Sequence, residues 1–203
     1  VKSLIRKDPK KDLRQVGVLS ANGKAFNFTG NKCFNWAGGK SGKNYTVQGN
    51  ILESKKVVEA MAKAFESSYG KAPLAERLIS ALKAGQEEGG DKRGMQSASL
   101  LIVKEGWGYG GNNDKFRDLR VDESNSPINE LHRVYLKHCE LFPRPEKYEI
   151  KNVCQIVTSY ADTTTATARV GLSPFMPYSK ASDLITVKES YIGFVVDPVN
   201  ELI

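Results

Sequence analysis

The stretch of sequence that decides the fold spans residues 45–65 and reads YTVQGNILESKKVVEAMAKAF. Its first eight residues are mostly apolar, β-branched or aromatic, and they predict a strand over residues 45–52. Ser54 follows as a candidate N-cap, and the next apolar side chains, from Val57 to Phe65, keep helical spacing. The chain is therefore expected to change from a strand to an amphipathic helix within a few residues.

Two more amphipathic helices are predicted further along the chain. One begins at Pro73, a favoured first-turn residue, and ends at Gly85, with leucines at steps of four along one face. Another begins at Pro127, and prolines stop it just beyond Phe142. Because the first two helices follow each other closely, we expect them to form an antiparallel helical layer over a sheet.

Strands are predicted on both sides of these helices. Two short apolar-rich runs, residues 15–19 and 24–29, flank Asn22-Gly23, a strong signal for a β-hairpin. The segments expected beyond the hairpin are a glycine- and asparagine-rich loop over residues 30–44 and strands over residues 96–103 and 116–121. Runs of strands with paired helices predict a layered α+β protein rather than a doubly wound parallel fold.

The last fifty residues differ in composition from the rest of the chain. They are rich in Thr, Ser and Val, and they hold 5 acidic and 3 basic side chains. Strands are expected near residues 153–160, 165–170, 184–188 and 191–196. This segment either forms a small β appendage or completes the sheet of the preceding part. The predicted organisation is one domain over residues 1–150 and a β-rich tail over residues 151–203.

The composition of the 203-residue chain argues against several classes of protein. No apolar run approaches the roughly 20 residues of a membrane-spanning helix, and the amino-terminal residues lack a signal-peptide pattern. With 3 cysteines and 2 histidines, a disulfide framework or a structural zinc site is not expected. We therefore expect a cytoplasmic protein that carries reduced thiols and uses no metal or cofactor.

The net charge of +7 is concentrated in the first 153 residues, which hold 27 of the 30 basic side chains and 18 of the 23 acidic ones. A nucleic-acid interface would interleave such a basic cluster with stacking aromatic side chains, and none is interleaved in the basic amino-terminal segment. The sequence therefore predicts neither a nucleic-acid partner nor a membrane partner.

Several other motifs have ordinary structural explanations. The glycine run over residues 106–111 lies between two predicted strands, so a hairpin connection is favoured over a phosphate loop, and its Trp107 and Tyr109 are candidate pocket walls. The aspartates that follow do not fit a calcium loop. His138 lies on the apolar stripe of the third helix and is expected to pack there, and no Ser-His-Asp set can be assembled.

Two polar stretches beside predicted strands form the candidate site. Gln48-Gly49-Asn50 ends one strand, where amide side chains can donate to an oxyanion and glycine lets a substrate approach the backbone. Residues 90–97 lead into the strand over 96–103, and Arg93 in this stretch can hold a substrate carboxylate by a bidentate contact. The candidate residues of this second stretch are Asp91, Arg93, Gln96 and Ser97. The alternative is a loop held by its own side-chain hydrogen bonds.

The sequence also contains a combination of motifs that is specific when taken together. The motifs include Asp12-Leu13-Arg14-Gln15-Val16-Gly17, Tyr45-Thr46-Val47-Gln48-Gly49-Asn50, Pro73-Leu74-Ala75-Glu76-Arg77-Leu78 and Gly108-Tyr109-Gly110-Gly111-Asn112-Asn113. On these residues the chain resembles the domain-of-unknown-function 1028 family, which is placed in the Ntn-hydrolase superfamily, over roughly residues 1–142. The resemblance implies a four-layer αββα sandwich, with two antiparallel sheets between helical layers.

The resemblance also implies a chemistry. In Ntn hydrolases the first residue of the mature chain, which is Thr, Ser or Cys, attacks an amide carbonyl, and its free α-amine acts as the base. The implied substrate is a small-molecule or peptide-like amide, and the implied association is a homodimer. Asn50 would supply an oxyanion donor, and the pocket would be lined by Gln48, Asp91, Arg93, Gln96 and Ser97.

The position of the nucleophile departs from the family pattern. In the family, a strand that begins with Thr precedes the position that Val1 occupies here. Residues 190–198, which read SYIGFVVDP, resemble that strand, and the match makes Ser190 the candidate catalytic nucleophile after cleavage behind Glu189. The alternative is a non-catalytic binding or assembly module on the same scaffold, with the tail as an unrelated β extension.

Overall fold

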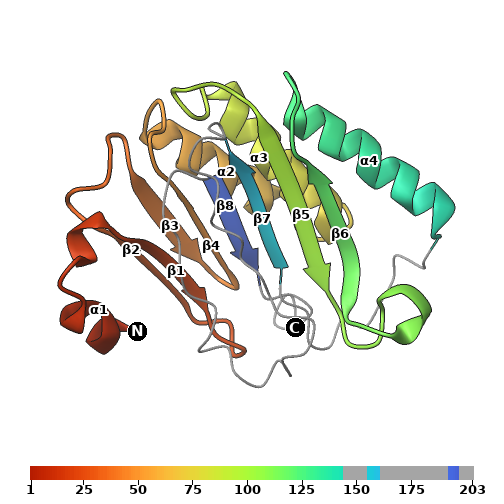
Figure 1. Cartoon of the computed structure of the whole chain (residues 1–203), viewed down its shortest axis with the longest axis horizontal. Coiled ribbons are helices and arrows are strands. Elements are labelled where there is room, and N and C mark those ends of the chain that lie inside the picture. The colour runs from red at the N-terminus through yellow and green to blue at the C-terminus, as the bar shows by residue number, and fades with distance from the viewer. Residues whose placement is uncertain (144–154, 161–191, 197–203) are drawn as a thin grey trace.

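The computed structural model describes residues 1–143, 155–160 and 192–196, and Figure 1 shows the arrangement of their helices and strands. The helices are α1 (Lys2–Lys7), α2 (Lys55–Ser67), α3 (Leu74–Glu87) and α4 (Pro127–Leu141). The strands are β1 (Gln15–Leu19), β2 (Ala25–Thr29), β3 (Gly38–Gly42), β4 (Tyr45–Gly49), β5 (Ser97–Val103), β6 (Lys115–Val121), β7 (Gln155–Tyr160) and β8 (Ile192–Val196). Short 3-10 helices span Lys11–Leu13 and Tyr109–Gly111.

Six strands form one antiparallel sheet in the order β3-β4-β8-β7-β5-β6. The two strands of the carboxy-terminal segment, β7 and β8, lie in the middle of this sheet, between β4 and β5 (Figure 1). They coincide with the strands expected near residues 153–160 and 191–196. The strands expected near residues 165–170 and 184–188 lie outside the described residues, as does Ser190.

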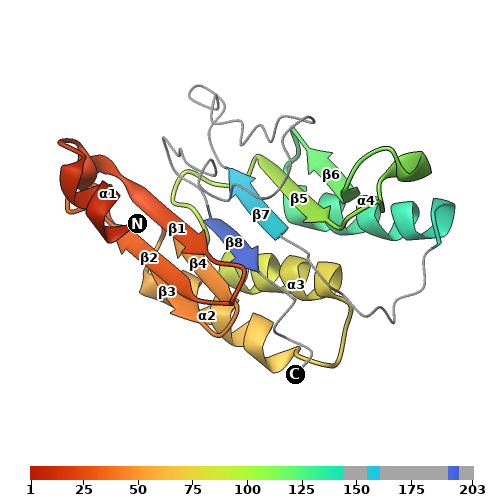
Figure 2. The same ribbon diagram turned by 90° about the horizontal axis from the view of Figure 1, so that it is seen from below.

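Helices α2, α3 and α4 cover one face of the six-stranded sheet (Figure 2). The core lies between these two layers, where Phe65, Leu78 and Leu131 of the helices are buried with Val47 and Leu100 of the strands. Full burial of an aliphatic or aromatic side chain of this size contributes roughly 1.5–3 kcal/mol to folding. The described residues therefore form an α+β fold with antiparallel sheets, as the order of the predicted elements indicated.

The ends of the helices test the predicted caps. Ser54 accepts a hydrogen bond from the backbone N–H of Lys56 at 3.2 Å, which confirms it as the N-cap of α2. The predicted end of the next helix at Gly85 is wrong, because α3 continues to Glu87. Gly85 is buried, and a Cβ at this position would lie 2.6 Å from Cγ of Met61. This glycine therefore allows α2 and α3 to pack closely and does not end the helix.

Strands β1 and β2 form the predicted hairpin, which lies against the sheet face opposite the helices, over β3 and β4 (Figure 2). Gly23 in the turn has φ +76°, a conformation that favours glycine. The side chain of Asn27 donates from Nδ2 to Oγ1 of Thr46 at 3.1 Å and to the carbonyl of Val47 at 3.3 Å. Polar side chains therefore join the hairpin to β4.

The loop predicted over residues 30–44 contains a strand that the sequence analysis missed. Strand β3 pairs with β4, with Gly39 opposite Gln48. Three of its five residues are glycines, which are depleted in strands, so the segment carries no local strand signal. A Cβ at Gly39 would lie 2.1 Å from Nδ2 of Asn27. The glycine is therefore required by the close approach of the hairpin, a contact distant in sequence.

Candidate functional site

The two polar stretches singled out in the sequence meet where β4 ends and the approach to β5 begins. Leu52 and Asp91 form an isolated antiparallel bridge. On either side of it, the backbone N–H of Lys92 donates to the carbonyl of Ile51 at 2.9 Å, and that of Glu53 donates to the carbonyl of Gly90 at 3.0 Å. The segment that follows Asn50 and the segment that contains Asp91 are therefore held side by side.

The side chain of Asn50 is held in one orientation by the backbone of the next residue, Ile51. Its Oδ1 accepts a hydrogen bond from the N–H of Ile51 at 3.0 Å. Ile51 has φ +57°, which is uncommon for a β-branched residue and marks a tight local turn. Within the described residues, no hydrogen bond uses the side-chain NH₂ of Asn50. The turn thus leaves that NH₂ group able to donate to a ligand.

Asp91 binds the side chain of Arg93. The Asp91 carboxylate accepts from Nε of Arg93 at 3.0 Å and from Nη2 at 2.8 Å, and it also accepts from the Arg93 backbone N–H at 2.9 Å. Asp91 is only 8% exposed, so this charge-assisted pair forms in a largely desolvated environment. Asp91 uses two donors of Arg93 and fixes the guanidinium in place, and a role for Arg93 in substrate binding stays a prediction.

Gln48 points away from the helices, into the contact between the sheet and the hairpin. Its Oε1 accepts from Nδ2 of Asn27 at 2.8 Å. A Cβ at Gly17 of β1 would lie 2.3 Å from the same oxygen, so the hairpin lies directly over the Gln48 side chain. Gln48 is 4% exposed and joins the two sheets. β4 ends at Gly49, so Asn50 lies beyond the strand, in the turn at Ile51.

Gln15 is a second residue in this contact, and the sequence analysis did not select it. Its Nε2 donates to the carbonyl of Gly49 at 2.7 Å, to that of Gly38 at 3.2 Å and to Oγ1 of Thr29 at 3.1 Å. The feature of the sequence that could have indicated Gln15 is an amide side chain in a short, mostly apolar strand. Asn27 is the same kind of residue in the facing strand. Both amides hold the hairpin against the ends of β3 and β4.

Gln96 and Ser97 lie further from Asn50 along the sheet. Nε2 of Gln96 donates to Oε2 of Glu123 at 3.0 Å, and the Gln96 carbonyl accepts from the N–H of Ser124 at 2.9 Å. Ser97 begins β5 and is opposite Tyr160 of β7. These two residues therefore face the connection between β6 and α4, while Asn50, Asp91 and Arg93 are brought together by the bridge at Leu52.

The register of the central strands brings the beginning of β8 to the same end of the sheet as Asn50. Gln48, near the end of β4, is opposite Gly193, near the beginning of β8. On the other side of β8, Ile192 is opposite Ser159, next to the last residue of β7. The ends of β4 and β7 and the beginnings of β5 and β8 thus gather at one end of the sheet.

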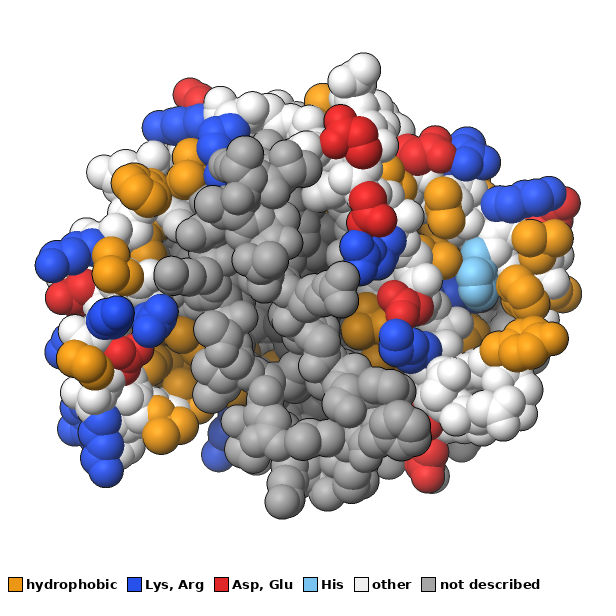
Figure 3. All heavy atoms as spheres, viewed as in Figure 1, with side chains coloured by type: hydrophobic (Ala, Val, Ile, Leu, Met, Phe, Trp, Pro, Cys, Tyr) orange, Lys and Arg blue, Asp and Glu red, His pale blue; other side chains and the backbone are white. Residues whose placement is uncertain are grey.

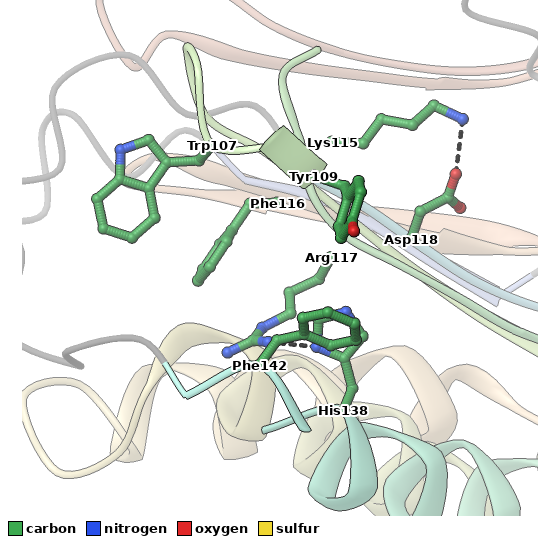
Figure 4. Close-up of a pocket in the computed structure, with 8 residues that line it drawn as sticks. All are labelled: Trp107, Tyr109, Lys115, Phe116, Arg117, Asp118, His138 and Phe142. Carbon is green, nitrogen blue, oxygen red and sulfur yellow. Dashed lines mark hydrogen bonds and ion pairs between the residues drawn. The ribbon is translucent and has the colours of Figure 1, made fainter. Parts of the chain in front are cut away.

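A separate pocket of about 160 Å³ lies at the opposite end of the sheet, where β6 begins, next to the carboxy-terminal part of α4 (Figure 4). It is lined by Trp107, Tyr109, Lys115, Phe116, Arg117, Asp118, His138 and Phe142. The expectation that Trp107 and Tyr109 wall a pocket is confirmed. Burial, and secondly the nearby Arg117, lower the pKa of His138 below its usual value, so its imidazole is neutral at pH 7.

The described residues contain neither a metal-binding cluster nor a helix that could span a membrane. Among residues 1–143, 155–160 and 192–196, no group of three or more His, Cys, Asp or Glu side chains is arranged to hold a metal ion. Within the same ranges, no helix has both the length and the apolar character needed to span a membrane.

The fold and the polar loops define an α+β protein whose candidate site lies at the meeting ends of β4, β5 and β8. The model of the Family of unknown function (DUF1028) matches residues 1–131, and the chain belongs to this family. It is similar to the crystal structure of protein SPO2555 from Silicibacter pomeroyi, which carries the same family label, with 25% identity and a TM-score of 0.57. The match covers 68% of this chain and 58% of that one. No curated protein matches the chain.

Proposed function

We propose that the protein is an N-terminal nucleophile hydrolase that cleaves an amide C–N bond where β4 ends and β8 begins. The observation that carries the proposal is the register in which Gln48 of β4 is opposite Gly193 of β8. A nucleophile just before β8 in the chain would lie close to Asn50, which follows β4. The proposed nucleophile is Ser190, two residues before the first residue of β8.

Ser190 becomes an amino terminus in this proposal when water hydrolyses the Glu189–Ser190 peptide bond. Oγ of Ser190 then attacks the carbonyl carbon of the substrate amide, its proton passes to the free α-amine, and the carbonyl oxygen becomes an oxyanion. An α-amine titrates near pH 8, so it can return the proton to the leaving nitrogen as the C–N bond breaks. Water hydrolyses the resulting ester, which restores Ser190 and releases a carboxylic acid.

Asn50 is the proposed oxyanion donor. Its Oδ1 is occupied by the N–H of Ile51, so its NH₂ group is oriented before a substrate arrives. A donor that is already oriented stabilises the transition state without reorganisation, and loss of one such donor costs about 10²–10³ in kcat. The hydrogen bond from Ile51 therefore supports the role of Asn50 as an oxyanion donor, because it orients the NH₂ group in advance.

The substrate class that we propose is a small-molecule or peptide-like amide. Asp91 and Arg93 lie on the loop next to Asn50, and Asp91 fixes the Arg93 guanidinium by two hydrogen bonds. In our proposal this rigid pair faces the polar end of the substrate. Gln96 and Ser97 are assigned to the outer parts of the same pocket, and Gln48, which is buried between the sheet and the hairpin, to its inner wall.

The fold that accompanies this function is the four-layer αββα sandwich. Helices α2, α3 and α4 form one outer layer, and the six-stranded sheet forms the next. The hairpin of β1 and β2 is the described part of the second sheet in this proposal, since it packs on the sheet face opposite the helices. The polar contacts of Gln15, Asn27 and Gln48 then lie between the two sheets.

The proposal is tested with the full chain, by amino-terminal sequencing together with assays of amine or ammonia release from a panel of small amides. We expect a chain that begins at Ser190 and hydrolysis of at least one amide. Ser190→Ala should remove both, while Ser182→Ala, a serine of the same segment, should change neither. An uncut chain that hydrolyses none of the amides would overturn the proposal.

A non-catalytic binding module is the second candidate function. The observation that favours it is the pocket beside α4, which is lined by aromatic and charged side chains and by no Ser, Thr or Cys among the described residues. Binding of a ligand there by a chain with no hydrolase activity would support this alternative.

A further inference from the structure

Arg117 is a buried cation in the wall of the pocket beside α4. It is 6% exposed, and none of the ion pairs among the described residues gives it a carboxylate partner. Its Nη1 contacts Nδ1 of His138, and its guanidinium lies 4.4 Å from the centre of the Phe116 ring (Figure 4). A buried charge without an opposite charge is costly, so Arg117 favours an anion at this position.

The other charges of the pocket do not neutralise Arg117. Lys115 and Asp118 bind each other at 2.6 Å, and both are partly exposed. His138 carries no charge at pH 7, because burial and Arg117 lower its pKa. With Nδ1 accepting from Arg117, the neutral imidazole carries its proton on Nε2 and can donate one more hydrogen bond. The pocket thus presents one net positive charge.

Aromatic rings form the remainder of the wall. Trp107 and Phe116 are in edge-to-face contact with ring centres 5.2 Å apart, and Tyr109 and Phe142 are in the same kind of contact at 6.3 Å. The register between β5 and β6 shifts at Phe116, where Val103 is opposite Lys115 and Ile102 is opposite Arg117. Such a bulge turns a side chain out of the regular alternation, and here it brings Phe116 to the pocket together with Arg117.

The apolar side chains of this region are also exposed. Tyr109, Leu141 and Phe142 are 80%, 61% and 45% exposed, and the face shown in Figure 3 has hydrophobic side chains gathered over β6 and α4. The cavity is about 160 Å³. A cavity of roughly 150 Å³ holds one benzene ring, so the space is suited to a single ring with a small substituent.

We propose that this pocket binds a small carboxylate that carries one aromatic ring, with Arg117 holding the carboxylate and the rings of Trp107, Phe116 and Tyr109 enclosing the aromatic group. A carboxylate matches the fork of a guanidinium and gives it the anionic partner that the protein does not supply. Edge-to-face and stacked contacts hold the ligand ring against the aromatic wall. The site lies where β6 begins, apart from the loops at Asn50 and Asp91.

The test is a calorimetric titration of the full chain with phenylacetate as the probe. Phenylacetamide has the same shape without the charge, and acetate has the charge without the ring. We expect phenylacetate to bind at least about tenfold more tightly than either, since hydrogen bonds to a charged group are stronger than neutral ones. Equal binding of phenylacetate and phenylacetamide, or no binding of phenylacetate, would overturn the proposal.

Two variants connect the binding to these residues. Tyr109→Ala changes an exposed side chain, so we expect it to fold, and it should weaken phenylacetate binding several-fold. Tyr69→Ala, which removes a half-exposed tyrosine that does not line the pocket, should leave binding unchanged. Arg117→Met should remove the preference for phenylacetate over phenylacetamide, and a thermal melt checks that it folds. Unchanged binding in Tyr109→Ala, or a retained preference in folded Arg117→Met, would contradict the assignment.

Discussion

The carboxylate of Asp91 holds the guanidinium of Arg93 by two hydrogen bonds, at 3.0 Å to Nε and 2.8 Å to Nη2. The backbone N–H of Arg93 donates to the same carboxylate at 2.9 Å, so a single side chain orders the whole turn. The turn is also joined to the residues after Asn50 by the bridge between Asp91 and Leu52. The Asp91–Arg93 pair therefore positions both loops of the candidate site.

Asp91→Asn should destabilise the protein by about 1–3 kcal/mol, because it removes the charge from a buried pair and leaves donors of Arg93 without their acceptor. Asp122→Asn is the matched control, since Asp122 pairs with Arg120 at the surface, where it is 76% exposed. The control should change stability by less than about 0.5 kcal/mol. Urea denaturation measures both, and equal midpoints for the two variants would contradict this account of Asp91.

Gly17→Ala should destabilise the contact between the hairpin and the sheet by about 1–3 kcal/mol, because the added Cβ would lie 2.3 Å from Oε1 of Gln48. In a Gln48→Ala background that side chain is gone, so the same glycine change should cost much less. A double-mutant cycle measured by denaturation gives the coupling between the two positions. Additive effects would show that Gln48 does not lie beneath position 17.

Asn50→Ala should lower the rate of amide hydrolysis about 10²–10³-fold, because it removes the proposed oxyanion donor. Its effect on stability should be small, since it removes one partly exposed hydrogen bond to the N–H of Ile51. Asn129→Ala is the control, because Asn129 is exposed and its side chain donates to Ser126 near the start of α4. Steady-state kinetics separate the two variants, and an active Asn50→Ala would remove Asn50 from the mechanism.

The pH dependence of stability should include a contribution from His138. Burial and Arg117 lower the pKa of His138 in the folded protein, so the unfolded chain takes up this proton first as the pH falls below about 6.5. The contribution of His138 to the free energy of unfolding is fully present above that pH. It declines as the pH drops toward the pKa of His138 in the folded protein.

His138→Gln should therefore reduce the loss of stability between about pH 7.5 and pH 5.5, measured by denaturation midpoints at each pH. His132→Gln is the matched control on the same helix, where His132 contacts Glu76 at 3.0 Å, and it should leave the His138 contribution in place. A His138→Gln profile that parallels the wild type would show that this histidine takes no part in the pH dependence.

The predicted elements that depend on local patterns agree with the structure. The Asn22-Gly23 turn, the Ser54 cap and the spacing of apolar side chains in α2 all act within a few residues of the chain. The α+β class follows from the order of these elements alone. Local chemistry was therefore sufficient to predict the hairpin, the three long helices and most of the strands.

The elements that the sequence analysis missed depend on contacts between distant residues. Gly39 of β3 lies close to Asn27 of the hairpin, and Gly85 inside α3 lies close to Met61 of α2. From the sequence alone, Gly39 looks like a loop residue and Gly85 looks like the end of a helix. Only the side chain that packs against each glycine shows otherwise. The close packing between layers is what determines both positions.

Only part of the candidate site could be predicted, because the rest also depends on contacts between distant residues. Polar residues at strand ends indicated Asn50, Asp91 and Arg93, and the bridge at Leu52 brings their loops together. The amides of Gln15 and Asn27 join the site's strands to the hairpin, but each is an isolated polar residue in its own segment. The pocket around Arg117 combines residues 107–118 with residues 138–142, which no local pattern connects.

Covalent labelling shows whether an N-terminal Ser190 attacks an amide beside Asn50, as we propose. The full chain is incubated with a β-lactone, an electrophile that acylates N-terminal nucleophiles, and the adduct is located by peptide mass spectrometry. We expect a single adduct on a peptide that begins at Ser190, and no adduct in Ser190→Ala. An unlabelled chain that remains uncut after Glu189 would contradict it.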